Sequence, residues 1–249
     1  MSATEPAVRV DHVSKRFGSK VVLDDISFEV PKGTAFCLLG KSGTGKSVTL
    51  KHIMGLIHPD RGCVMVNGND IGAMDRTALA RARREIGFVF QNAALFDSIT
   101  VAENVAFPLR RHTDWAEDKI GERVKQVLEQ VGLDGDENTM PADLSGGMRK
   151  RAGLARAMAL DPSILLVDEP SAGLDPLTAA EIDRLLLTLK EHEGTTLVVV
   201  THSMPSARRV GDTLAVIEDG HLIAQGTPED LSHSDHEMVR AFIGSNGQG

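Results

Sequence analysis

The sequence predicts an α/β fold in which a parallel sheet is covered by helices on both faces. Two apolar runs, "SILLVDEP" (163–170) and "TTLVVVTH" (195–202), have the composition of fully buried strands. The segment between them, "LTAAEIDRLLLTLKEHEG" (177–194), has the pattern of a helix. Strands that alternate with helices are typical of a parallel sheet, and 249 residues can bury a core of that size.

The first ninety residues should begin with antiparallel strands and then enter the parallel sheet. Short strand patterns punctuated by Gly and Pro lie at 8–18, 21–33 and 62–71. The apolar runs "TAFCLLG" (34–40) and "EIGFVFQ" (85–91) fit further strands, and a helix should extend from about Lys46 to Leu56.

The rest of the chain adds a helical insertion and a C-terminal hairpin. Residues 92–143 are mostly helical in character, and their apolar residues recur at helical spacing at Ile120, Val124, Val127, Leu128 and Val131. The stretch 213–226 fits a hairpin that turns at Asp219-Gly220. A last helix should open at 227–231, with a Thr as its N-cap and a Pro in its first position.

Charge and composition exclude several classes of protein. Lys plus Arg is 27 and Asp plus Glu is 35, so the net charge is −8, which disfavours a protein that coats nucleic acid. No apolar run approaches the roughly 18 residues of a membrane span, and the N-terminus lacks a secretory pattern. Cys37 and Cys63 lie in apolar stretches and are expected to be buried, reduced thiols. We therefore expect a cytoplasmic protein.

A glycine-rich loop at 40–47, "GKSGTGKS", follows a predicted strand and precedes a predicted helix. It fits the phosphate-binding pattern G-x-x-x-x-G-K-[ST] in full, and that context makes a chance glycine-rich turn the weaker interpretation. Lys46 should reach the β- and γ-phosphates, and the Ser47 hydroxyl should ligate Mg²⁺. The candidate nucleotide-binding residues here are Gly40, Lys41, Ser42, Gly43, Thr44, Gly45, Lys46, Ser47 and Val48.

Two acids end the apolar strand "ILLVDE" (164–169). Asp168 leaves the strand tip where it can hold Mg²⁺, directly or through water. Glu169 is placed to orient and deprotonate an attacking water. By themselves these acids would be solvated residues at a strand end, but a phosphate loop in the same chain favours the catalytic interpretation.

Three more residues are candidates on weaker grounds. His202 follows an apolar strand and could sense the γ-phosphate, although alone it would be an ordinary loop histidine. Gln91 ends another strand and could contact Mg²⁺ or the lytic water. Phe17 precedes the phosphate loop and could stack on adenine, or it could belong to the core.

The stretch "LSGGMRKRAGLARA" (144–157) has the make-up of a second phosphate-binding helix start. Ser145, Gly146 and Gly147 can present N–H groups, and Arg149, Lys150 and Arg151 should follow in the first turn. Basic residues there oppose the helix dipole, which an approaching polyphosphate would offset. A solvated basic face is the alternative for Arg149 and Lys150.

Together these residues resemble the motif set of the ATP-binding cassette (ABC) ATPases, over nearly the whole chain. In order they match the aromatic A-loop residue (Phe17), Walker A (40–47), the Q-loop (Gln91), the signature "LSGGM" (144–148), Walker B (164–169), the D-loop "SAGLD" (171–175) and the switch histidine (His202). Seven elements in one order are far more specific than any one of them.

The resemblance implies a P-loop NTPase fold with a RecA-like parallel-sheet core, an antiparallel β subdomain and a helical subdomain. The whole chain, 1–249, would be one nucleotide-binding domain. Its parts would be 7–91 and 160–226 (core with the β subdomain), 92–159 (helical subdomain) and 227–249 (C-terminal helix and tail).

The resemblance also implies a mechanism. ABC ATPases dimerise head to tail, so that the signature of one subunit, here Ser145, Gly146 and Gly147, caps the nucleotide in the Walker A loop of the other. This chain would bind ATP and Mg²⁺ and would need a second copy of itself. Asp175 would carry communication between the two sites, while Glu169, His202 and Gln91 would act in hydrolysis and Ser47, Gln91 and Asp168 would hold the metal.

Several stretches are similar to the ATPases of Mla/Mce-type lipid transporters, among them "FQNAALFDSITVAENVAFPLRRHT", "LSGGMRKRAGLARAMALDP" and "VRAFIG" near the C-terminus. That resemblance implies phospholipid or related cargo, integral-membrane permease subunits and an MCE-domain lipid-binding protein. It also raises a STAS-domain regulatory subunit as a further partner. The chain would then lie on the cytoplasmic face of the inner membrane through its permease and would bind no nucleic acid.

Three other functions remain open on the sequence. An importer of another solute, such as amino acids, would carry the same motifs because the ATPase does not touch the cargo. A soluble ABC protein of DNA repair or cofactor assembly is disfavoured by the acidic balance and by a gap of about a hundred residues between Walker A and the signature. A regulatory module without turnover is disfavoured by Glu169 and His202.

Overall fold

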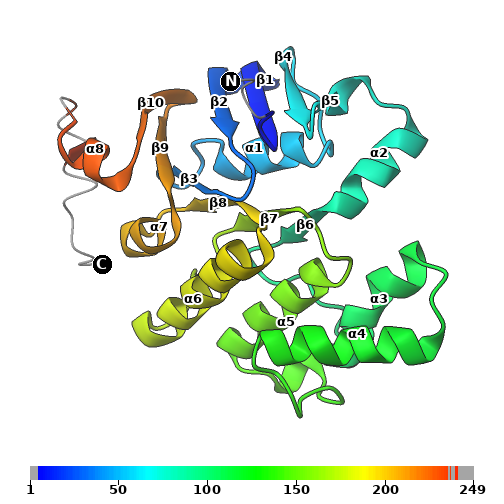
Figure 1. Ribbon diagram of the computed structural model, residues 1–249. Coiled ribbons are helices and arrows are strands. Elements are labelled where there is room, and N and C mark those ends of the chain that lie inside the picture. Colours follow the sequence, from blue (N-terminus) through cyan, green and yellow to red (C-terminus); the bar gives the residue numbers. More distant parts are fainter. Residues whose placement is uncertain (1–4, 235, 237–238, 241–249) are drawn as a thin grey trace.

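The computed structural model describes residues 5–234, 236 and 239–240 and arranges them around two sheets (Figure 1). The smaller sheet has the strand order β2-β1-β4-β5. β1 pairs antiparallel with both β2 and β4, in agreement with the strand patterns of the first ninety residues. The bounds of its strands are β1 Val8–Phe17, β2 Lys20–Val30, β4 Arg61–Val66 and β5 Asn69–Asp70.

The larger sheet has the order β10-β9-β3-β8-β7-β6. Its strands are parallel except β10, which forms an antiparallel hairpin with β9 at the sheet edge. The bounds are β3 Ala35–Leu39, β6 Ile86–Val89, β7 Ile164–Asp168, β8 Thr196–Thr201, β9 Thr213–Glu218 and β10 His221–Gly226. The parallel sheet and the C-terminal hairpin predicted from the sequence are both confirmed.

Both faces of the larger sheet are buried, which explains its almost continuous apolar strands. In β3, Ala35, Cys37 and Leu39 belong to one core cluster, whereas Phe36 and Leu38 belong to the other. Each large apolar side chain that is fully buried stabilises the folded state by about 1.5–3 kcal/mol. The two clusters hold the strand ends, and the loops that follow them, in fixed places.

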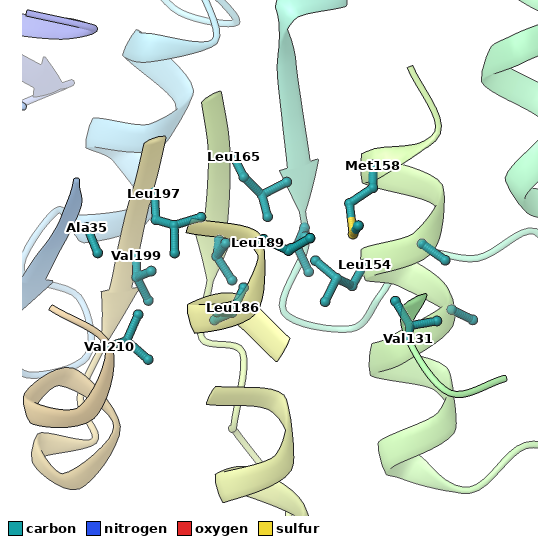
Figure 2. Packing of buried hydrophobic residues seen from close by; sticks show 14 of the residues in the cluster. Ala35, Val131, Leu154, Met158, Leu165, Leu186, Leu189, Leu197, Val199 and Val210 are labelled. Carbon is teal, nitrogen blue, oxygen red and sulfur yellow. The ribbon is translucent and has the colours of Figure 1, made fainter. Parts of the chain in front are cut away.

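Helices cover the two faces unequally. On one face lie α1 (Lys46–Ile53) and the antiparallel sheet. On the other face, Leu186 and Leu189 of α6 (Pro176–Glu193) and Val210 of α7 (Met204–Val210) pack on β8, and the same cluster continues to Leu154 and Met158 (Figure 2). One continuous core therefore joins the sheet to the inserted helices.

The inserted segment is built from three helices, which pack beside the end of the larger sheet formed by β6 and β7 (Figure 1). They are α3 (Val101–His112), α4 (Glu117–Gln130) and α5 (Gly146–Met158), with a 3₁₀ turn at Pro141–Asp143. The apolar residues that the spacing placed on one face, Ile120, Val124, Val127, Leu128 and Val131, are all buried. The helical character predicted for 92–143 is confirmed by α3 and α4, and α5 follows that segment.

The loop between β6 and α3 is held by Asn104, which is 0% exposed. Its Oδ1 accepts a hydrogen bond from Phe96 N at 2.8 Å, and its Nδ2 donates to Phe96 O at 3.1 Å and Thr100 O at 3.0 Å. Thr100 and Glu103 close the helix start with a capping box. The buried side-chain amide of Asn104 thus supplies hydrogen-bond partners for the main chain of this loop.

Some elements differ from the expectation. α1 ends at Ile53 rather than near Leu56. Two helices were not predicted, α2 (Arg76–Ala82) and α7. α2 has no fully buried residue, and its Leu79 and Ala82 pack against the core while only partly buried. The predicted last helix forms as α8 (Pro228–Ser232) with a Thr227 cap. Of the stretch "VRAFIG" (239–244), only positions 239–240 belong to the described residues, and positions 241–249 lie outside them.

The cysteines are free thiols; Cys37 is buried as expected, and Cys63 is half-buried. Burial raises the pKa of the Cys63 thiol. Within the described part of the chain, no helix combines the length and the apolar character needed to cross a lipid bilayer.

We predict that Asn104→Ala destabilises the protein, because it leaves buried backbone groups of the loop without partners. Each orphaned group costs about 1–3 kcal/mol, and for a chain of this size each kcal/mol lowers the melting temperature by about 2–4 °C. Thermal unfolding followed by circular dichroism measures the change. Asn92→Ala, at an exposed position of the same loop, is the control, and equal melting temperatures for the two variants would contradict the role of Asn104.

Candidate functional site

The predicted phosphate loop connects the end of β3 to the start of α1. Gly45 precedes α1 and has a left-handed backbone with φ 102°. A Cβ there would lie 2.5 Å from Leu23 Cδ2 and 2.8 Å from Val22 O, and a Cβ at Gly40 would lie 2.5 Å from Ile217 O. Only glycine fits at these two positions, which lets the loop pass closely against β2 and β9.

The other loop residues differ in exposure. Lys41, Ser42 and Gly43 are exposed, whereas Ser47 and Val48 are half-buried in the first turn of α1. The Thr44 hydroxyl donates to Lys41 O at 2.9 Å and closes the loop on itself. The loop therefore ends at a helix N-terminus, where backbone N–H groups favour an anion.

Lys46 turns its side chain under the loop. Its Nζ donates to Gly40 O at 2.8 Å and to Lys41 O at 3.0 Å. The same nitrogen lies 3.6 Å from Glu169 Oε1, and both side chains are at least nine-tenths buried. An ammonium and a carboxylate are thus held together in a region that water screens poorly.

Ser47 and Asp168 meet beside that pair. The Ser47 hydroxyl donates to Asp168 Oδ1 at 2.9 Å. Burial raises the pKa of Asp168, while the Ser47 hydrogen bond works in the opposite direction. Within the described residues, no three His, Cys, Asp or Glu side chains group closely enough to hold a metal ion by themselves. A hydroxyl and a carboxylate are oxygen ligands of the kind that Mg²⁺ takes from proteins, with phosphates and water completing its shell, so this pair fits that ion.

Glu169 follows the last residue of β7 and has a left-handed backbone with φ 49°. Its N–H donates to Val200 O of β8 at 2.9 Å. Its carboxylate Oε2 accepts from His202 N at 3.2 Å and lies 2.8 Å from His202 Nδ1. Glu169 is buried, whereas the His202 side chain is 58% exposed. The histidine therefore connects a buried carboxylate to solvent.

Gln91 is exposed and lies in a turn two residues beyond β6, rather than at the end of the strand as predicted. Its carbonyl oxygen accepts a hydrogen bond from Lys150 Nζ at 2.5 Å. The same Nζ donates to Glu169 O at 3.0 Å. This lysine joins the Gln91 loop to the end of β7.

The basic run after the signature is therefore not a uniform solvated face. α5 begins at Gly146, so Lys150 and Arg151 lie in its second turn and not in the first as predicted. Arg149 is exposed and donates to Leu144 O, which agrees with the solvated interpretation. Lys150 is buried, which contradicts that interpretation for this residue. Arg151 forms a salt bridge with Glu181.

The signature residues lie against the start of α6 rather than against the phosphate loop. Ser145 caps α5 through a bond from Met148 N at 3.2 Å. A Cβ at Gly147 would lie 2.5 Å from Thr178 Cγ2. Thr178 in turn donates its hydroxyl to Asp175, the N-cap of α6. No hydrogen bond or salt bridge of the described residues joins 145–147 or Asp175 to the loop at 40–47.

Phe17 ends β1 with its ring 50% exposed, so it is not a core residue. Lys15 Nζ lies 5.7 Å from the ring centroid. Phe17 pairs with Lys20 across the antiparallel sheet, two residues before the Val22 that meets Gly45. The exposed ring thus lies at the turn between β1 and β2, on the strand pair that also contains the Val22 next to Gly45.

The candidate residues form two groups in this chain. Lys46, Ser47, Asp168, Glu169 and His202 are linked by direct contacts, and Gln91 joins them through its main chain. The signature and Asp175 form the second group around the start of α6. The sequence reasoning left the role of Lys150 open; its spacing from Gly147 and Leu154 (i, i+3, i+7) on the buried face of α5 was the signal that it points inward.

Comparison with known proteins shows the family of this chain. Residues 23–172 match the family model described as "ABC transporter". The "Probable ribonucleotide transport ATP-binding protein mkl" of Mycobacterium leprae is 43% identical over 237 residues, which are 95% of this chain and 68% of that protein. The "Intermembrane phospholipid transport system ATP-binding protein MlaF" of Escherichia coli (strain K12) is 38% identical over 231 residues, 93% of this chain and 86% of that protein.

Two further comparisons extend the range. The "Methionine import ATP-binding protein MetN" of Staphylococcus haemolyticus is 37% identical over 241 residues, 95% of this chain and 70% of that protein. A solved dimeric, post-hydrolysis ATP-binding cassette bound to ADP and Pi superposes with a TM-score of 0.82 at 32% identity, and the match covers 88% of this chain and 98% of that one. The chain therefore belongs to the ABC transporter family, as an ATP-binding subunit whose hydrolysis of ATP drives transport.

Proposed function

We propose that this chain is the ATP-hydrolysing motor of a bacterial lipid transporter of the Mla/Mce type. ATP closes a head-to-tail dimer of the chain, and hydrolysis reopens it and drives a separate permease. The observation that carries the motor is the contact of Lys46 with Glu169, beside Ser47 and Asp168. This contact supports the proposal because the groups proposed for phosphate binding, metal binding and water activation then lie side by side.

In this proposal the chain's own residues divide the work. Lys46 exchanges its two carbonyl acceptors for β- and γ-phosphate oxygens. Glu169 accepts the proton of the attacking water, and His202 orients that carboxylate and senses the γ-phosphate. Phe17 stacks on adenine, and backbone N–H groups of the phosphate loop bind the remaining oxygens, along Gly40, Lys41, Ser42, Gly43, Thr44, Gly45, Ser47 and Val48.

The metal site of the proposal is made by Ser47 and Asp168, with Gln91 added when its side chain turns inward. Mg²⁺, when bound, neutralises the charge that develops on the transferred phosphate. The 2.9 Å contact between Ser47 Oγ and Asp168 Oδ1 supports this assignment because two oxygen ligands of the kind that Mg²⁺ takes are already neighbours.

The separation of the two groups supports a dimer. In this protomer Gly147 lies against Thr178 of α6 and Gly146 lies near Leu174, and no hydrogen bond of the described residues joins 145–147 to the phosphate loop. The free N–H groups of 145–147 can then cap the nucleotide of a partner copy, with Asp175 between the two sites. We also propose the division into a core with its β subdomain (7–91 and 160–226), a helical subdomain (92–159) and a C-terminal part (227–249).

A groove beside the Gln91 loop supports docking of a permease. Phe90, Phe96 and Phe107 expose 42–48% of their surface there, and Arg84 and Arg156 also line the groove. A large exposed aromatic patch is typical of an interaction site. A permease helix seated here would keep the chain on the cytoplasmic face of the inner membrane. An MCE-domain protein would belong to the same complex, and a STAS-domain subunit could regulate it.

Lipid cargo is supported by the similarity to MlaF over 93% of this chain. An amino-acid importer is the second candidate, and the similarity to MetN favours it. The residues of the ATP site are compatible with either cargo, because the cargo is bound by other subunits.

Lys46→Ala should abolish ATP turnover or reduce it by about 10²–10³-fold, because it removes the charge that faces the transferred phosphate. Steady-state release of inorganic phosphate measures this, and fluorescent-nucleotide binding separates loss of affinity from loss of chemistry. Lys125→Ala, which removes an exposed lysine of α4, is the control. Turnover by Lys46→Ala at the rate of Lys125→Ala would show that the loop is not the phosphate site.

Glu169→Gln should keep ATP binding but lower turnover by about 10²–10⁴-fold, since the amide cannot accept the water's proton. The variant should also accumulate an ATP-bound dimer, detectable by size-exclusion chromatography with light scattering. Glu122→Gln, at an exposed position of α4, should behave like the wild type. If Glu169→Gln turned over ATP at the wild-type rate, the base would be another group.

The tagged chain, pulled down from detergent-solubilised membranes of its host, should bring a permease, an MCE-domain protein and bound phospholipid. Mass spectrometry of the co-purifying proteins and lipids identifies them. A permease recovered with a soluble solute-binding protein would favour the importer instead, and absence of any membrane partner would favour a soluble ABC protein.

A further inference from the structure

Lys150 is a buried charge within the site that no motif assigns. It lies in the second turn of α5 and is 8% exposed, although its neighbour Arg149 is exposed. Its Nζ donates to Gln91 O at 2.5 Å and to Glu169 O at 3.0 Å. Three segments of the chain therefore meet at one ammonium: the inserted helices, the loop after β6 and the end of β7.

A buried ammonium in this position needs hydrogen bonds that offset its loss of hydration. Burial lowers the pKa of Lys150, and the charges of Glu169 and Asp168 oppose that effect. A buried charge is unfavourable unless it is hydrogen-bonded. Two main-chain oxygens of the site, Gln91 O and Glu169 O, supply those bonds. If the lysine left, Gln91 O would lose this donor, and Glu169 O would keep the longer bond from Ala172 N at 3.3 Å.

One of the two main-chain oxygens that Lys150 binds belongs to Glu169, whose backbone is strained. Glu169 is left-handed, with φ 49°, a conformation that persists in a non-glycine residue only where its surroundings over-determine it. On one side its N–H is bonded to Val200 O of β8. On the other side its carbonyl accepts from Lys150 at 3.0 Å and, at the longer distance of 3.3 Å, from Ala172 N. These bonds set the direction in which the Glu169 carboxylate leaves the chain.

The loop that contains Gln91 is bound to the same helix a second time. Ala93 and Ala94 also have left-handed backbones, with φ 57° and 50°. Arg156, further along α5, donates to their carbonyl oxygens at 2.8 and 2.7 Å. The loop and α5 therefore move together, and Lys150 is the contact through which both reach Glu169.

We propose that Lys150 is a positioning residue that couples the helical segment and the Gln91 loop to the catalytic carboxylate. When α5 lies in place, the Lys150 ammonium holds the Glu169 peptide in its left-handed conformation and aims the carboxylate. When α5 and its loop move away, the peptide is released and the carboxylate loses its aim. This inference rests on the proposed role of Glu169 as the general base.

The test compares Lys150→Met, which keeps the length of the side chain and removes its donors, with Lys150→Arg, which keeps the charge and the donors. The full chain is used, purified with the membrane partners it retains. Lys150→Met should lower kcat by about 10²-fold, the effect of displacing a reacting group by about 1 Å, with the KM for ATP little changed. Lys150→Arg should recover activity to within about tenfold of the wild type.

Lys190→Met is the matched control. Lys190 is a lysine of α6 whose side chain is 13% exposed and whose Nζ contacts Asp212 at 2.9 Å, away from both groups of candidate residues. Its loss should lower the melting temperature and leave kcat unchanged. A folded Lys150→Met with wild-type kcat would overturn the proposal, as would an equal fall in kcat for Lys190→Met.

Two further measurements keep the outcome decisive. If Lys150→Met does not fold, Lys150→Arg is compared with Lys150→Gln, and equal kcat values at equal melting temperatures would overturn the proposal. In the Glu169→Gln background, Lys150→Met should cause no further loss of the residual turnover, because its effect passes through Glu169; an additional loss of about 10²-fold would show an independent role. Normal turnover by Glu169→Gln itself would refute the proposed base instead.

Discussion

The site depends on the register of three parallel strands. Leu39 of β3 pairs with Thr201 of β8, and Asp168 of β7 pairs with Val200 of β8. Because parallel strands end at the same edge, the phosphate loop, the paired acids and His202 leave the sheet side by side. The apolar packing on both faces holds that register, since a slip of one residue would exchange the side chains of the two faces. Burial of Leu197 and Val199 therefore contributes directly to the position of Lys46 and Glu169.

The sequence predicted those elements whose conformation is determined by the residues of one short segment. Apolar runs predicted the strands of the parallel sheet, and the glycine spacing predicted a loop whose Gly45 has no room for a Cβ. The helix α2 was missed because it buries no side chain fully; Leu79 and Ala82 pack against the core only in part. Boundaries such as the end of α1 depend on packing against other elements, which the local pattern does not contain.

Polar residues that bind a second segment of the chain were the hardest to predict. Lys150 contacts Gln91, which is 59 positions away, and the Asn104 amide binds Phe96, which lies 8 positions earlier in the loop before its helix. In each case a polar residue interrupts an apolar helix face, and such a residue needs a partner when it is buried. That signal says that a partner exists but not which one. Whether a basic residue is solvated or buried depends on the direction in which its side chain leaves the helix. Arg149 and Lys150 are adjacent, yet Arg149 is exposed and Lys150 is buried.

Asp175 already uses both of its carboxylate oxygens within its own chain. One accepts from the N–H groups of Leu177 and Thr178, and the other accepts from the Thr178 hydroxyl. These bonds lower the pKa of Asp175 and cap an 18-residue helix. Any contact with a second subunit that draws on this carboxylate has to compete with the cap, which stabilises the helix start. By thermodynamic reciprocity, fraying at the start of α6 and affinity for the second subunit would then be linked. Substitutions that stabilise or weaken this helix end would therefore change the affinity between the two subunits.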